Sequence, residues 1–380
     1  MYRRVEALRK SATLNIGETF TLLLPEHGLL SSLMLHIRGT PVTDSMNAIE
    51  KWRMLDWISK IEVIGNGSTI IKSFTGRVAH YLNWKDGGGA APDKHFNYGS
   101  STKRFHVPVN FGRFLGDLLY GLDLTPWKSV ELKITNDGSS TYFTGNLSAD
   151  IFALWVHDPP SGAFQKYFRT EEWRSLVTVQ AKTEYLDLPE EGQLRRLALQ
   201  VDPAVDSTTK AADTTLYNVL NNIKLTKKTG SDIIFDSSLR DLWYWEYFAK
   251  GRDLLQPLEP YHTTAYGIRT GLGQTLGEAG LRLPQSGTQN TYGTGIWPGD
   301  DSSTLRRGVA SDPTQDALLV MGLSLENCAA FDFNEPDEES SYLDLKSEGT
   351  VQMQLYTADS ASADNGTIRV MLDRPMSPPI

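Results

Sequence analysis

The stretch LPEHGLLSSLMLHI, residues 24–37, recurs as LPEEGQLRRLALQV, residues 188–201. Seven of the fourteen aligned positions are identical, and an eighth pairs Ile37 with Val201. The two copies are offset by 164 residues (188 minus 24). A sequence motif, here called the repeated phrase, that recurs at this distance within one chain predicts a repeated domain.

Further matches follow in the same order along the chain. Residues 67–71, GSTII, match residues 230–234, GSDII, at an offset of 163. Residues 122–134, LDLTPWKSVELKI, match residues 343–355, LDLKSEGTVQMQL, at an offset of 221. Three matches in the same order predict a duplicated domain, and the change of offset predicts an insertion of 58 residues (221 minus 163) in the second copy.

Each copy has the sequence pattern of β-strands joined by turns. Leu33, Leu35 and Ile37 alternate with more polar neighbours, which is the period of a strand with one buried face. The Pro-Glu-x-Gly before them favours a turn, because Pro fixes φ and Gly accepts positive φ. Asn66-Gly67 is a strong signal for a hairpin over residues 61–71.

The remaining elements of the two copies follow from the same patterns. We expect short helices at Thr75–Trp84 and Ser238–Ala249, the second with Ser238 as its N-cap and Asp241 three residues later. Three more strands are expected at Lys103–Phe111, Ser129–Thr135 and Asp150–His157.

These elements predict an all-β fold with two tandem jelly-roll β-sandwiches, a double jelly roll with short embedded helices. Immunoglobulin-like connectivity remains an alternative, because strand order is not visible in one sequence. The expected domains are a basic N-terminal arm (1–12), a first jelly roll (13–160), a connector (161–173) and a second jelly roll (174–380). The second roll contains a Gly-rich insertion at about 251–316, where residues 251–310 hold 11 of the 32 glycines.

Charge is unevenly distributed along the chain. The net charge is −9, which argues against a general nucleic-acid binder, and residues 311–380 alone carry −10. The arm instead carries a local +3 from the cations Arg3, Arg4, Arg9 and Lys10 against Glu6. Apolar residues at positions 2, 5 and 8 suit a short amphipathic helix that contacts anionic lipid or nucleic acid. A solvated tail is the alternative interpretation.

No sequence signal indicates catalysis, a cofactor or a metal. The chain lacks the nucleophile-elbow, zinc-protease and P-loop motifs, and its seven histidines have no metal-ligand spacing. Asp332, Asn334 and Asp337 suit either a solvated acidic loop or a cation site. The single cysteine, Cys328, excludes an intramolecular disulfide. The charged N-terminus is unlike a signal peptide, and no apolar run has the length of a membrane span, so we expect a soluble chain that is not an enzyme.

Two tandem sandwiches with a basic arm and one outsized loop resemble the double jelly-roll major capsid proteins of tailless icosahedral viruses. That lineage includes adenovirus hexon and membrane-containing phages, and the segment KIEVIGNGSTIIKSFTGRVAHYL, from Lys60, is similar to its phage members. The duplication carries the resemblance, which transfers no catalytic residue.

The resemblance implies a structural protein of the virion, made in the host cytoplasm and assembled as homotrimeric, pseudo-hexagonal capsomers. It implies contacts with neighbouring capsomers, with penton or minor capsid proteins, and of the inner face with membrane or genome. Two alternatives stay open at this point. One is a tandem-sandwich carbohydrate-binding or glycan-processing protein, and the other is a minor virion spike or vertex protein.

Overall fold

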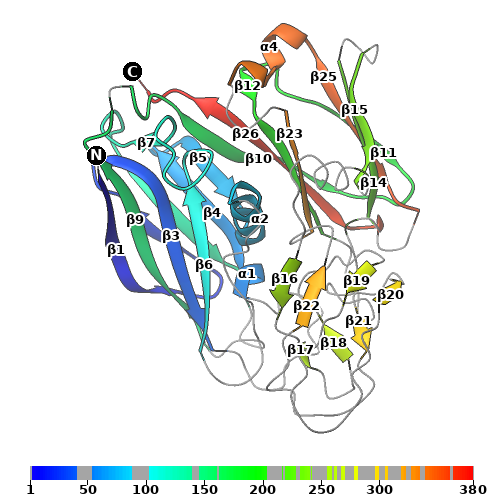
Figure 1. Cartoon of the computed structure of the whole chain (residues 1–380), viewed down its shortest axis with the longest axis horizontal. Helices are drawn as coiled ribbons and strands as arrows, with labels where there is room; N and C mark the ends of the chain where they lie inside the picture. Colours follow the sequence, from blue (N-terminus) through cyan, green and yellow to red (C-terminus); the bar gives the residue numbers. More distant parts are fainter. Residues whose placement is uncertain are drawn as a thin grey trace.

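The computed structural model shows two β-sandwiches side by side (Figure 1). It describes residues 2–40, 54–87, 102–138, 145–160, 162–202, 216, 219–227, 232–239, 241, 255–258, 261–262, 267–269, 278–280, 296–298, 304–306, 318–321, 327–333, 339–359 and 363–379. Within these ranges, no helix combines the length and the apolar character needed to cross a bilayer.

The first sandwich consists of two sheets that enclose a shared apolar core. The outer sheet has the order β1 (Tyr2–Leu14), β9 (Leu147–His157), β3 (Leu29–Gly39) and β6 (Lys103–Asn110), with the short β7 (Leu122–Asp123) beside β3. The inner sheet has the order β2 (Glu18–Leu23), β8 (Val130–Asn136), β4 (Ile58–Gly65) and β5 (Thr69–Phe74). The helices α1 (Met54–Trp57) and α2 (Gly76–Asp86) flank β4 and β5 in the chain.

The second sandwich repeats this arrangement. One of its sheets has the order β10 (Tyr167–Val177), β26 (Thr367–Met376), β13 (Arg196–Asp202) and β23 (Cys328–Asp332). The other has the order β11 (Thr183–Asp187), β25 (Val351–Thr357), β14 (Leu220–Lys227) and β15 (Asp232–Ser238). The short strands β12 (Gln193–Leu194) and β24 (Leu343–Asp344) pair with each other, and α4 (Leu345–Glu348) follows them.

Strand order identifies both sandwiches as jelly rolls. When the eight long strands of each copy are counted along the chain, their sheets read 1-8-3-6 and 2-7-4-5 in both. The chain therefore winds back and forth between two sheets, which is jelly-roll connectivity and not the immunoglobulin alternative. The predicted double jelly roll is confirmed.

The repeated phrase occupies the same place in both rolls. Pro25 and Pro189 lie in the turns that lead to β3 and β13, and Gly28 and Gly192 in these turns have φ of +130° and +74°. Both glycines therefore occupy the positive-φ region for which the sequence selects Gly. At Gly28 a Cβ would also lie 2.9 Å from the Trp155 ring.

The expected hairpin and helix starts are also present. Asn66 and Gly67 have φ of +53° and +75° between β4 and β5, as in a type I′ turn. Thr75 caps α2 by accepting a hydrogen bond from the Val78 N–H, and Ser238 accepts one from the Asp241 N–H at 3.0 Å. The rest of the expected helix at 239–249 falls almost wholly outside the described residues.

Two of the expected boundaries are wrong. Residues 2–14 form β1, an edge strand paired with β9, so the segment is neither an arm preceding the first roll nor a helix. Residues 167–177 form β10, so most of the expected connector is already the first strand of the second roll. β1 lies at a sheet edge and β10 lies between the two rolls, and burial does not alternate regularly along either strand, which explains why period two was not visible in the sequence.

The Gly-rich insertion at about 251–316 lies largely outside the described residues. Its described backbone forms very short antiparallel strands, namely β16 (Leu255–Leu258), β17 (Tyr261–His262), β18 (Gly267–Arg269), β19 (Glu278–Gly280), β20 (Ile296–Pro298) and β21 (Thr304–Arg306). β16 pairs with β22 (Leu318–Met321), which follows the insertion. These strands lie at the end of the molecule opposite both chain termini (Figure 1).

Candidate functional site at the junction of the two sandwiches

The two rolls meet where β5 of the first lies beside β10 of the second. These strands run parallel, with Lys72 opposite Thr170 and Ser73 opposite Glu171. The contact merges the adjoining sheets into one eight-stranded sheet that continues from β2 to β23. We call the contact of β5, α2 and β6 with β10, β13, β23 and β26 the junction.

A buried lysine lies at the centre of the junction. Lys72 is 4% exposed, and its Nζ donates a hydrogen bond to Thr170 Oγ1 at 2.8 Å. Thr170 Oγ1 in turn donates to Asp373 Oδ1 at 2.7 Å. The Thr170 hydroxyl therefore bridges the Lys72 ammonium of the first roll and the Asp373 carboxylate of the second.

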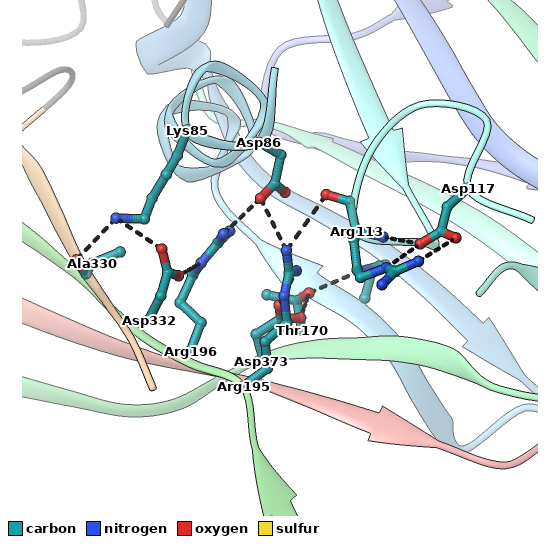
Figure 2. A network of polar contacts seen from close by, with 11 residues as sticks. Lys85, Asp86, Arg113, Asp117, Thr170, Arg195, Arg196, Ala330, Asp332 and Asp373 are labelled. Carbon is teal, nitrogen blue, oxygen red and sulfur yellow. Dashed lines mark hydrogen bonds and ion pairs between the residues drawn. The ribbon is translucent and has the colours of Figure 1, made fainter. Parts of the chain in front are cut away.

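Asp86, the last residue of α2, receives two arginines from the second roll (Figure 2). Arg195 Nη2 lies 3.2 Å and Arg196 Nη2 lies 2.6 Å from Asp86 Oδ1. Arg195 Nη1 also donates to Asp373 Oδ2 at 2.9 Å. Charge-assisted bonds of this kind are stronger than neutral ones and fix the angle at which the groups meet.

A second carboxylate, Asp332 of β23, connects Lys85 of α2 with Arg196 of β13 (Figure 2). Arg196 Nε donates to Asp332 Oδ1 at 2.5 Å, and Lys85 Nζ lies 3.4 Å from Asp332 Oδ2. Lys85 Nζ also donates to the Ala330 carbonyl at 3.2 Å. The end of α2 is thereby tied to β13 and β23 through both cations and anions.

The loop after β6 completes the junction. Arg113 binds Asp117 in a bidentate pair, with Nε to Oδ2 at 2.7 Å and Nη2 to Oδ1 at 3.0 Å. The Arg113 carbonyl accepts from Arg195 Nη2 at 3.5 Å, and the Arg195 guanidinium lies 4.6 Å from the centre of the Phe168 ring. Arg195 thus contacts a carboxylate from each roll and an aromatic face.

Burial and neighbouring charges shift the pKa values of these groups in opposite directions. Burial lowers the pKa of Lys72 to about 8, although the carboxylate of Asp373 acts in the other direction. Burial would raise the pKa of Asp373, but Arg195, Lys72 and Arg196 outweigh it, and the pKa lies below its ordinary value. Asp373 therefore remains ionised, whereas Lys72 holds its proton weakly.

Lys72 differs from the other cations of the junction. Lys85, Arg113, Arg195 and Arg196 each form an ion pair with a carboxylate, whereas among the described residues Lys72 has none within 4 Å. Lys72, Asp86, Arg195 and Asp373 line a cavity of about 30 Å³, which is enough space for a water molecule. Asp86, Asp117, Asp332 and Asp373 each lie within ion-pair distance of a cation, an arrangement that suits a structural joint.

The junction was not predicted, but comparing the two copies gives a signal for it. In the repeated phrase, Ser31-Ser32 of the first copy corresponds to Arg195-Arg196 of the second at the offset of 164. A pair of serines replaced by a pair of buried arginines in an otherwise apolar strand marks a face with a new, charged partner. The strand itself is equivalent in the two copies, and what differs is the part of the molecule that covers it at these positions.

The four cations predicted as a lipid or genome contact lie on β1 and do not converge. Arg3 and Arg4 are exposed neighbours on opposite faces of the strand. Arg3 Nη2 donates to the Gly116 carbonyl at 3.0 Å, and Arg4 lies 3.5 Å from Glu6. Arg9 and Lys10 are also exposed, further along the same strand.

No group of three or more potential metal ligands occurs within the described residues. Asp332 of the suggested cation loop is occupied by Lys85 and Arg196, while Asn334 and Asp337 lie outside the described residues. The described part of that loop therefore favours an ion-pair role for Asp332.

Comparison with known proteins shows the fold through structure and not through sequence. No protein-family profile and no curated protein matches the chain. Among solved structures, the major capsid protein of Sulfolobus turreted icosahedral virus (STIV) matches with a TM-score of 0.58 and 12% identity, covering 100% of this chain and 98% of that one.

Two further capsid proteins match over nearly their whole length. The major capsid protein P2 of bacteriophage PM2 has a TM-score of 0.51 and 11% identity, covering 99% of this chain and 98% of that one. The PBCV-1 protein VP54 has a TM-score of 0.55 and 10% identity, covering 98% and 94%. Because these matches cover 98–100% of this chain, and therefore both rolls, the chain has the double jelly-roll fold of these viral major capsid proteins.

Proposed function

We propose that the protein is a major capsid protein that assembles as homotrimeric, pseudo-hexagonal capsomers of an icosahedral virion and has no enzymatic activity. The observation that carries the proposal is the fusion of two jelly rolls by a buried, charged junction into one continuous sheet. A fixed angle between two rolls is what a ring built from several such pairs requires. The end-to-end likeness to capsid proteins of three different viruses supports this role.

The two ends of the molecule differ in a way that suits the inner and outer faces of a shell. Both termini lie at one end of the chain, and the strands of the insertion lie at the other (Figure 1). The proposal places the insertion on the outer face, where it contacts neighbouring subunits, and the termini on the inner face. There Arg3, Arg4, Arg9 and Lys10 would face anionic lipid or nucleic acid, while penton or minor capsid proteins would bind at the shell vertices.

The experiment is to express the chain, measure its mass in solution and examine it by electron microscopy. A trimer that forms pseudo-hexagonal particles or shells is the expected result. A monomer that binds glycans in an array would favour the carbohydrate-binding alternative. A trimer present in virions at only a few copies would identify a spike or vertex protein instead.

A further inference from the structure

The duplication extends to strand β1, which precedes the three matched stretches in the chain. The ladders align residues 2–9, YRRVEALR, with residues 167–174, YFRTEEWR, at an offset of 165, and four of the eight positions are identical. Both strands also have a bulge at the same step, between Ala7 and Arg9 and between Glu172 and Arg174. β1 is therefore the counterpart of β10.

Strand β15 is the counterpart of β5 by the same test. β5 pairs with β4, and β15 with β14, in ladders that match step for step. The offset is 163 between β5 and β15 and 162 between β4 and β14, and each ladder has a bulge at the same step. Lys72 corresponds to Phe235 and Ser73 to Asp236. The junction contact of β5 with β10 thus has an unformed counterpart, β15 with β1.

Both strands of this counterpart have a free edge in the single chain. Within the described residues, β1 pairs only with β9, and β15 pairs only with β14. A free edge of 13 residues, the length of β1, offers a row of unpaired backbone groups to another strand. The two strands belong to opposite outer margins of the chain, so they cannot meet within one molecule (Figure 1).

The sheet face beside β1 also lacks the cover that its counterpart has. In the second roll, Ala198, Cys328 and Met371 face the first roll and are 1–2% exposed as part of its core. Their counterparts in the first roll are Met34, His106 and Phe152, which are only partly buried. The same face of the fold is thus buried in the second roll and partly exposed in the first.

We propose that β15 of one subunit docks beside β1 of a second copy of this chain, in parallel, and repeats the junction between subunits. The inference rests on the proposed trimer, whose subunit interface it names. The register follows from the junction: Phe235 lies opposite Val5, and Asp236 opposite Glu6, of the next copy. The contact joins different surfaces of the two subunits. Three copies, which contain six rolls, close a ring when each contact between neighbouring rolls, within or between subunits, turns by a sixth of a circle.

The side chains suit an interface that forms after folding. Lys72 and Thr170 of the junction are replaced by Phe235 and Val5, and Val5 is 69% exposed in the single chain. Ile233, also on β15, is 57% exposed. The apolar contact replaces the buried charges, which two separate molecules would have to desolvate on meeting.

The facing acids are already compensated within each subunit. Glu6 lies 3.5 Å from Arg4, and Asp236 lies 3.4 Å from Lys224. The two acids therefore approach as members of ion pairs and not as bare like charges.

Disulfide trapping tests the register. One variant carries Glu6→Cys and another carries Asp236→Cys, both at exposed or half-exposed sites, and the buried Cys328 is kept. Mixed and oxidised, they should give a covalent dimer on a non-reducing gel, and the double variant should give a closed trimer. The control pairs Glu6→Cys with Asp187→Cys on β11, at the opposite edge of the same sheet as β15, and should not cross-link.

A second set of variants tests the apolar contact without cysteine chemistry. Val5→Glu and Ile233→Glu change exposed side chains, so the subunit should fold while the dissociation constant of the trimer rises at least ten-fold in sedimentation experiments. Leu23→Glu on β2, where Leu23 is 60% exposed, is the matched control and should leave the trimer unchanged.

The outcomes separate this inference from the proposed function. A trimer that does not cross-link through positions 6 and 236, and that tolerates Val5→Glu and Ile233→Glu, overturns the joint alone. Cross-linked open filaments would support the joint and refute the trimer. A monomeric wild-type protein would overturn both.

Discussion

Replacing Lys72 by Met should make the protein more stable at neutral pH and remove a pH dependence that the wild type has. Lys72 is buried in the junction, and its one hydrogen bond among the described residues goes to Thr170. Met has a similar length and no charge to desolvate. The variant therefore isolates the free energy of keeping this ammonium charged inside the fold.

The magnitude follows from the pKa shift. Folding lowers the pKa of Lys72 from 10.5 to about 8, and each pKa unit is worth about 1.4 kcal/mol, so the charged form destabilises the fold by about 3 kcal/mol. The unfolded chain binds the proton more tightly, so between pH 8 and 10.5 the unfolded state carries more protons. Wild-type stability from this group therefore rises with pH, by about 2 kcal/mol between pH 7 and 9.5.

The unfolding free energies of wild type and Lys72→Met are measured by urea unfolding at matched subunit concentration, at pH 7.0, 8.0, 8.75 and 9.5. The variant should have a higher unfolding free energy than the wild type at pH 7, and this difference should shrink by about 2 kcal/mol by pH 9.5. Lys85→Met is the matched control, because Lys85 is equally buried but contacts Asp332 and the Ala330 carbonyl. It should lose about 1–3 kcal/mol at pH 7, since it leaves buried acceptors less satisfied.

Two results would refute the reasoning. A stability difference between Lys72→Met and wild type that stays constant from pH 7 to 9.5 would show that Lys72 is not titrating in this window. A variant less stable than wild type at pH 7 by as much as Lys85→Met would show that the ammonium contributes favourable contacts that outweigh its desolvation.

Three further outcomes are expected. Asp373→Asn should lower the unfolding free energy at pH 7 by about 2–3 kcal/mol, because Arg195 loses a charged partner, and the loss should vanish as acid protonates Asp373 in the wild type, whose folded pKa is depressed. Limited proteolysis of dissociated subunits should cut within residues 251–316 before either sandwich, whereas assembled shells should resist; equal resistance in both states would contradict this. Arg9→Gln with Lys10→Gln should weaken binding to anionic vesicles or nucleic acid in flotation or filter assays at low salt by several-fold, and unchanged binding would leave these cations without that role.

The sequence predicted the architecture because repeated, one-sided strands carry a visible pattern. The stretch 29–39 alternates buried and less buried residues, and the same alternation recurs in β8, β9 and β25. The turns at Asn66-Gly67 and Gly28 needed residues that accept positive φ, and these are rare enough to read directly. The duplication then extended each local inference to the second copy.

Strands at sheet margins and at the junction lacked that pattern. β1 is exposed along most of its length, so its cations and its apolar residues at i, i+3 and i+6 suited a helix as well as a strand. The junction residues are brought together from positions as far apart as Lys85 and Ala330, and nothing local in the sequence links them. The one accessible signal was the difference between copies at Ser31-Ser32 and Arg195-Arg196, which is informative only once the copies are aligned.

The continuous sheet through both rolls also affects the entropy of assembly. Each association step between free molecules costs on the order of 4–15 kcal/mol in lost translational and rotational freedom. In the proposed trimer every second contact around the ring is the β5–β10 contact, which forms during folding at the high effective concentration set by a short connection. That contact can therefore carry buried charges that would slow the meeting of separate molecules, while the remaining contacts need only be strong enough to form late and reversibly. A shell built this way can correct misplaced subunits without unfolding them.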